Sequence, residues 1–187
     1  MNLTNQCPCA CVFCVRGLQD GVGSAHSLWH EDDPTWDAIE RALASWDFGA
    51  AQEVVFCGYG EPMCALEHLK QAAGWLRQNY PHLKLRLDTN GLGDLIHGRP
   101  TACELAGLID AVSISLNAPN AARYHELVRS CWGEAAFDAM LQFARDCQVH
   151  IPSVTFSVVS VLTEEEIAQC REIAARFGAP LRVRMRG

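Results

Sequence analysis

Extended apolar segments alternate with helical patterns along the chain, and this alternation constrains the fold more than any other feature of the sequence. Strands are predicted at residues 2–5, 53–57, 83–89, 111–116, 153–161 and 181–185. Helices are predicted at residues 35–46, 65–80, 101–108, 134–147 and 163–177. Because a connection that holds a helix is too long for a hairpin, the strands should be parallel and joined by right-handed crossovers.

The pattern inside the strands distinguishes between the two common parallel architectures. In residues 83–89, leucines at every second position alternate with Lys84, Arg86 and Asp88. Strands covered by helices on both faces would be almost continuously apolar. We therefore expect helices on one face and a polar cavity on the other, in an α/β partial (β/α)6 TIM-like barrel that is open on one side. In the last strand, the alternating arginines also fit the protection of an exposed sheet edge.

Length and charge limit the classes of function. The 187 residues fit a single domain, and 49% of them are hydrophobic, which is enough for a sizeable core. The net charge of −7 disfavours non-specific binding of nucleic acid. No apolar run reaches the ~20 residues of a membrane span, and no export signal is recognisable. We expect a cytoplasmic protein with no membrane partner.

The cysteines are concentrated at one point of the chain. Four of the ten lie within eight residues, directly after the first predicted strand, at Cys7, Cys9, Cys11 and Cys14. All four could hold a structural zinc or a fully ligated iron–sulfur cluster. Alternatively, Cys7, Cys11 and Cys14 could bind three irons of a four-iron cluster and leave the fourth iron open. Spacing alone does not choose between these sites.

Further polar and glycine-rich segments follow successive strands. They are Gly58-Tyr59-Gly60-Glu61-Pro62, Asp88-Thr89-Asn90-Gly91 and Ser113-Ile114-Ser115-Leu116-Asn117. Each segment alone is typical of a turn. Parallel strands, however, end on one common rim, where such folds place their sites. We expect these segments to meet the cysteine cluster there, with glycines that let the backbone approach a ligand.

In this combination the sequence resembles the radical S-adenosylmethionine (SAM) superfamily. Cys7, Cys11, Phe13 and Cys14 match its C-x3-C-x-aromatic-C signature, and Gly58 to Pro62 resembles its Gly-Gly-Glu-Pro segment, with Tyr59 in place of the first glycine. The resemblance implies a single radical SAM core domain over residues 1–187. Its cofactors would be a [4Fe-4S] cluster and SAM, and its product a 5'-deoxyadenosyl radical that abstracts hydrogen from an unidentified substrate.

The resemblance also implies the site residues. The cluster ligands would be Cys7, Cys11 and Cys14. The SAM contacts would be Phe13, Gly58, Tyr59 through its backbone, Gly60, Glu61, Asn90, Ser115 and Asn117. Residues 2–5, Cys9, residues 20–29, 58–62 and 115–119 are moreover similar to the TatD-associated radical SAM proteins. No residue is predicted to act on the substrate.

Several alternatives stay open at this point. Pro8 favours extended backbone that turns Cys9 away, so Cys9 is predicted not to be a ligand; a non-catalytic four-Cys iron–sulfur or zinc module would require it. A glycyl-radical-type activating enzyme would share the proposed chemistry. His26 and His30 are interpreted as solvated. Four arginines could meet an acidic group, with nothing to rank them: Arg16, Arg123, Arg129 and Arg184.

The same reasoning suggests partners. Reduction of the cluster requires a one-electron donor of the flavodoxin or ferredoxin type. No segment after the last strand would cover the lateral opening of the barrel, which favours a bulky substrate, a protein or another macromolecule, that closes the site. A TatD-like protein is a further candidate partner.

Overall fold

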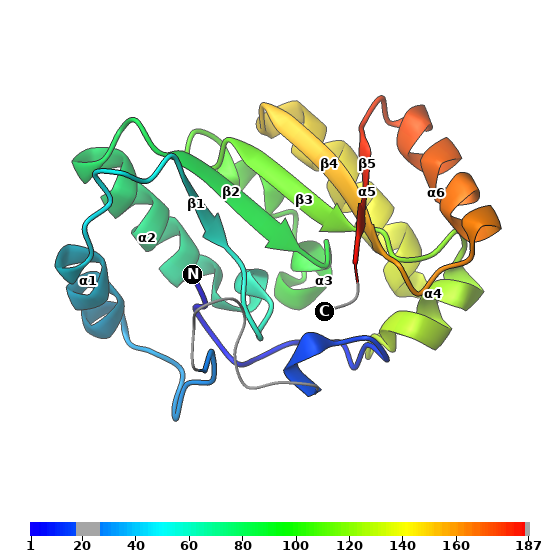
Figure 1. The fold of residues 1–187 in the computed structure, drawn as a ribbon, viewed down its shortest axis with the longest axis horizontal. Helices are drawn as coiled ribbons and strands as arrows, with labels where there is room; N and C mark the ends of the chain where they lie inside the picture. The colour runs from blue at the N-terminus through cyan, green and yellow to red at the C-terminus, as the bar shows by residue number, and fades with distance from the viewer. Residues whose placement is uncertain (18–26, 186–187) are drawn as a thin grey trace.

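The computed structural model describes residues 1–17 and 27–185, and its centre is an open sheet of five parallel strands (Figure 1). Neighbouring strands follow the order of the sequence. The strands are β1 (Glu53–Phe56), β2 (Lys84–Thr89), β3 (Ala111–Ser115), β4 (Ser153–Val159) and β5 (Leu181–Arg184). The predicted fold class, an α/β partial barrel of parallel strands, is confirmed.

Helices connect the strands. The α-helices are α1 (Trp36–Ser45), α2 (Leu66–Asn79), α3 (Gly93–His97), α4 (Ala121–Val128), α5 (Ala135–His150) and α6 (Glu164–Arg176). The 3-10 helices are η1 (Val15–Gly17), η2 (Pro62–Ala65) and η3 (Ala102–Leu105). The helix predicted at residues 163–177 corresponds to α6, and a capping box starts it, because Thr163 and Glu166 exchange side-chain and backbone hydrogen bonds. None of the helices described is long and apolar enough to cross a membrane.

Two α-helices, α3 and α4, were not predicted, and one predicted helix was too long. Of residues 101–108, only the short η3 is helical. Its turn is closed by the hydrogen bond that the Glu104 amide donates to the Thr101 carbonyl. The short α3 begins without a side-chain cap, so the sequence carries no start signal for it. The start of α4 is signalled by Asn120, whose side chain accepts a hydrogen bond from the Arg123 amide.

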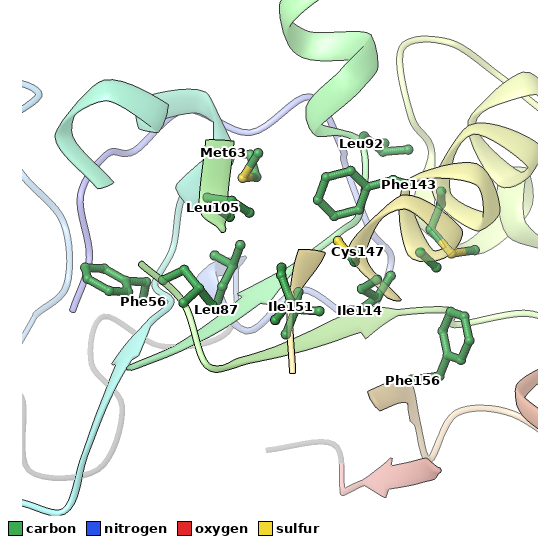
Figure 2. Close-up of a cluster of buried hydrophobic side chains, with 14 of the residues drawn as sticks. Phe56, Met63, Leu87, Leu92, Leu105, Ile114, Phe143, Cys147, Ile151 and Phe156 are labelled. Carbon is green, nitrogen blue, oxygen red and sulfur yellow. The ribbon is translucent and has the colours of Figure 1, made fainter. Parts of the chain in front are cut away.

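The two faces of the sheet differ as the strand pattern predicts. Leu85, Leu87 and Ile114 are fully buried and belong to the hydrophobic core that the strands share with the helices. Figure 2 shows Leu87 and Ile114 packed near Phe143 of α5 in one hydrophobic cluster. On the other face Arg86 stays partly exposed. The helices therefore stabilise the sheet from one side and leave the other side polar.

The first predicted strand is a correction to the sequence analysis. Residues 2–5 are not a strand, although they run next to β1 and then below the strand ends in Figure 1. The Met1 amine donates to the Val55 carbonyl at 2.7 Å, and the Cys57 amide donates to the Met1 carbonyl at 3.0 Å. Farther on, the segment takes side-chain partners instead, since the Thr4 hydroxyl donates to Asp33 at 2.8 Å.

The glycines after β1 accommodate this N-terminal segment. A Cβ on Gly60 would lie 2.1 Å from the Thr4 carbonyl oxygen, and one on Gly58 would lie 2.0 Å from the Asn2 side chain. Real Cβ atoms do not approach backbone so closely. The space that was expected to admit a ligand is therefore occupied, at these two positions, by the chain itself.

Substitution of Gly60 tests this packing. Gly60→Ala should lower the free energy of unfolding by about 2 kcal/mol, because the Thr4 backbone cannot yield as a side chain would. Gly74→Ala on α2 is the matched control: its Cβ would meet nothing within 4 Å, and alanine favours a helix. Urea unfolding of the cluster-free protein measures both; equal stability of the two variants would contradict the close approach.

Candidate active site

The residues predicted to bind a cluster and SAM line one cavity of about 360 Å³ at the carboxyl ends of the strands. The predicted members are Cys7, Cys11, Phe13, Cys14, Gly58, Tyr59, Gly60, Glu61, Asn90, Ser115 and Asn117. They come from segments up to 110 positions apart. The common edge of the parallel strands brings together the members that follow β1, β2 and β3, and the cysteine loop lies over that edge. Their convergence is a structural observation; their individual roles stay predictions.

The cysteine loop is held over this edge by backbone hydrogen bonds to the end of α4. The Val12 amide donates to the Leu127 carbonyl at 2.9 Å, and the Ala10 amide donates to Val128 at 3.2 Å. Cys9 forms an isolated antiparallel bridge with Ser130. This anchoring buries Cys9 and leaves the three predicted ligand thiols partly exposed to the cavity.

Cys9 has a different electrostatic environment from its neighbours. Hydrogen bonds to the sulfurs of Cys11 and Cys7, together with burial, raise the pKa of Cys9. The hydrogen bond from Cys9 lowers the pKa of Cys7 to about 6 and also lowers the pKa of Cys11. Of these three thiols Cys9 therefore holds its proton most tightly, and it can donate that proton to Cys7 or to Cys11. That it is not a metal ligand stays a prediction.

The cysteines do not surround one point. Among the residues described, no three His, Cys, Asp or Glu side chains are arranged around a single metal ion. The thiolates of a four-iron cluster bind separate irons, so they need not converge on one position.

Glu61 is the acid of the cavity. It is 4% exposed, and Pro62 starts η2 directly after it. Its Oε1 accepts hydrogen bonds from the Thr89 hydroxyl at 2.6 Å and the Met63 amide at 3.0 Å, whereas Oε2 accepts one, from the Asn90 amide at 2.7 Å. Burial outweighs these donors and raises the pKa of Glu61 to about 7. Oε2 thus retains capacity to accept a further donor.

Three buried polar atoms have no hydrogen-bond partner among the described residues, and all three belong to residues that line this cavity. They are Asn117 Oδ1, the Tyr124 hydroxyl and Arg184 Nε. Buried polar groups are almost always paired in native proteins, so atoms left over around one cavity indicate a polar ligand. Asn117 also has a left-handed backbone, with φ of +54°, which is uncommon for a residue other than glycine. Three thiols, an acid and unpaired polar atoms fit a [4Fe-4S] cluster and SAM.

The structure also ranks the four arginines. Only Arg184 lines the cavity. Arg16 reaches the carbonyl oxygens of Tyr59 at 3.5 Å and Cys9 at 3.4 Å, and Arg123 forms ion pairs with two glutamates on the outer helices. Arg129 has a left-handed backbone at the end of α4.

Sequence reasoning missed two polar lining residues, Cys57 and Tyr124, and it placed Asp88 and Thr89 at this edge without selecting them as SAM contacts. Asp88 and Thr89 stand directly before the selected Asn90, and Cys57 directly before Gly58, so their position at strand ends was the available signal. Tyr124 lies on the unpredicted α4 and had none. His30 contacts the Asn2 carbonyl at 3.3 Å, whereas His26 lies outside the described residues.

Comparison with known proteins identifies the family. Residues 1–174 match the model of the Radical SAM superfamily, so the chain belongs to that superfamily. This confirms the resemblance to the superfamily and supports the expectation of an enzyme with a [4Fe-4S] cluster and SAM as cofactors; it does not test the TatD-associated branch. A comparison with curated proteins gives no match.

Solved structures with the same fold include the following three proteins. The first is anSMEcpe with bound AdoMet, to which the chain is 18% identical. The superposition has a TM-score of 0.68 and covers 99% of this chain and 50% of the anSMEcpe chain. The second is a radical SAM methyltransferase from Sphaerobacter thermophilus, with a TM-score of 0.69 and 17% identity. This superposition covers 98% of this chain and 54% of the methyltransferase chain. The third is SuiB from Streptococcus suis bound to S-adenosylmethionine, with a TM-score of 0.68 and 14% identity. This superposition covers 100% of this chain and 38% of the SuiB chain. The chain spans about half the length of the first two, and these likenesses establish the fold.

The buried acid predicts a pH-dependent stability. The pKa of Glu61 is higher in the folded chain, about 7, than its ordinary value of 4.5, so the folded state binds this proton more tightly. The protonated Glu61 should therefore contribute about 3 kcal/mol to the free energy of unfolding. This contribution should be fully present below about pH 4.5 and should be lost as the pH rises through about 7. Urea unfolding of cluster-free wild type and Glu61→Gln between pH 5 and 8 measures it, with exposed Glu40→Gln as the control. An unchanged slope in Glu61→Gln would contradict the assignment.

The unpaired hydroxyl of Tyr124 gives a second stability prediction. Tyr124→Phe should stabilise the cluster-free protein by about 1 kcal/mol, because it removes a buried donor that has no partner and leaves the ring in contact with Phe137. Denaturant unfolding measures the change. A loss of stability of similar size would show that the hydroxyl is already paired.

Proposed function

We propose that this chain is a radical SAM enzyme that cleaves SAM reductively and uses the 5'-deoxyadenosyl radical to remove a hydrogen atom from a substrate. The observation that carries the proposal is the single cavity in which the cysteine loop, Glu61 and the unpaired polar atoms meet. Family membership supports the same chemistry.

Each part of the cavity has a role in this proposal. The thiolates of Cys7, Cys11 and Cys14 would hold three irons, while the single proton of the Cys9 thiol can be donated to Cys7 or to Cys11. When bound and reduced, a cluster held there would supply the electron needed to break the C5'–S bond of SAM. Glu61 Oε2 has room for the methionine ammonium group, whose positive charge would stabilise the ionised form of this buried acid.

The far side of the cavity suits the nucleoside. Asn117 Oδ1 is an unpaired acceptor, and the Ser115 hydroxyl lies on the same strand end, so both can bind ribose hydroxyls. Phe13, Leu28 and Val128 supply apolar lining, which keeps water from a reactive intermediate. The residues of this chain thus position SAM and exclude water, and the cofactors carry the difficult step.

The finer assignments belong to the proposal as well. We include the TatD-associated branch, a cytoplasmic location, a flavodoxin- or ferredoxin-like electron donor and a bulky substrate, with a TatD-like protein as a candidate partner. Two alternatives would leave different traces. A non-catalytic four-Cys module requires Cys9 and no SAM, whereas a glycyl-radical activating enzyme would transfer the radical to a partner protein.

Cysteine substitutions test the function directly. After anaerobic reconstitution with iron and sulfide, addition of dithionite and SAM to wild type should yield 5'-deoxyadenosine, measured by liquid chromatography. Cys9→Ser should keep this product within about threefold, whereas Cys11→Ser should lower it at least 100-fold, because one iron loses its ligand. The opposite order would make Cys9 a ligand and favour the four-Cys module.

A further inference from the structure

The concave face of the sheet carries charged side chains that the cofactors do not use. Arg86 and Asp88 of β2 and Arg182 and Arg184 of β5 project from this face. A second cavity of about 320 Å³, lined by Arg86 and Arg182 among others, lies on it. Arg182 links the two cavities, because its guanidinium lies 3.8 Å from the Asp88 carboxylate, which lines the first.

The carboxylates of this face are already engaged. Arg86 pairs with Asp88 at 2.6 Å and with Glu53 at 3.2 Å, and Arg182 takes the second oxygen of Asp88. Arg184 has no carboxylate within 4.0 Å in the described chain. Three guanidinium groups therefore face two carboxylates, and the surplus positive charge lies on Arg184.

Arg184 is also short of hydrogen-bond partners. Its Nη2 donates to the Ser115 hydroxyl at 3.2 Å, and its buried Nε donates to nothing among the residues described. Burial is the largest influence on its pKa and lowers it, which reflects the cost of a charge in a desolvated position. A guanidinium with free donors in a cavity is suited to a planar or tetrahedral oxyanion, which it can bind through two hydrogen bonds.

The methionine end of SAM does not need this charge. In the function proposed above, Glu61, which follows β1, would hold the methionine ammonium group, and the methionine carboxylate would lie beside it, at the iron that the three cysteines leave open. Figure 1 shows β5 at the opposite side of the sheet from β1. The hydrogen bond to Ser115 instead places Arg184 next to the expected ribose position, where a substrate must present the hydrogen that is removed.

We propose that Arg184, supported by Arg182, binds an oxyanion of the substrate, a carboxylate or a phosphate group, and so places the substrate beside the ribose of SAM. This inference rests on the proposed function and adds a substrate class to it. The reaction would then act on acidic molecules or on acidic positions of a larger substrate.

Anion binding to the reconstituted protein, saturated with SAM, tests the proposal. Inorganic phosphate and succinate are the probes, with succinamide as the uncharged control, and isothermal titration calorimetry measures their dissociation constants. Arg184→Gln should raise the dissociation constant of the more tightly bound anion at least tenfold. Arg184→Lys should raise it less, because the positive charge is kept. Arg171→Gln, on the exposed side of α6, should leave it within twofold.

Each outcome has a defined meaning. Preference for phosphate or for succinate identifies the acidic group, and both support the proposal. The proposal is overturned if neither probe binds wild type more tightly than it binds Arg184→Gln, or if succinamide binds as tightly as succinate. It is also overturned if Arg184→Gln weakens the binding of SAM itself at least tenfold, since the arginine would then bind the cofactor. Failure of wild type to form 5'-deoxyadenosine, with anion binding still lost in Arg184→Gln, would refute the proposed function and leave the anion site standing.

Discussion

The whole site depends on the close approach of the N-terminal segment to the loop that follows β1. The Glu61 amide donates to the Gln6 carbonyl at 2.8 Å, and the Thr4 carbonyl occupies the space that a side chain on residue 60 would fill. On the other side Asp33 accepts hydrogen bonds from the Thr4 hydroxyl and the Asn5 amide, which lower the pKa of Asp33 although burial opposes them. Both contacts act just before Cys7, so they fix the cysteine loop relative to the buried acid.

Much of this arrangement follows from local sequence patterns. Alternating leucines in residues 83–89 predict a sheet covered on one face, and the Thr163 capping box predicts the start of α6. The convergence of the site residues that follow β1, β2 and β3 has one geometric reason, because segments that come after successive parallel strands share an edge. The cysteine loop follows no strand and is held at this edge by its backbone hydrogen bonds to the end of α4. Asn90 and Asn117 could be selected in this way although each would be an ordinary turn residue by itself.

What the sequence did not predict depends on distant contacts. Residues 2–5 look like a strand, but Asn5 exchanges hydrogen bonds with the backbone of His30, and such partners have no local signal. Arg184 could not be separated from three other arginines, because its isolation depends on which carboxylates Arg86 and Arg182 engage across the sheet. Tyr124 was missed for the same reason, since its hydroxyl becomes notable only when the cavity around it is seen.

The central claim is that three thiolates, and not four, hold the cluster, so that one iron stays open for SAM. Mössbauer spectroscopy of the reconstituted, ⁵⁷Fe-labelled protein before and after addition of SAM tests it most directly. The account predicts that one iron in four changes its isomer shift when SAM is added, while the other three do not. The claim would be contradicted if the isomer shifts of all four irons stayed the same after addition of SAM, or if the protein bound zinc in place of iron.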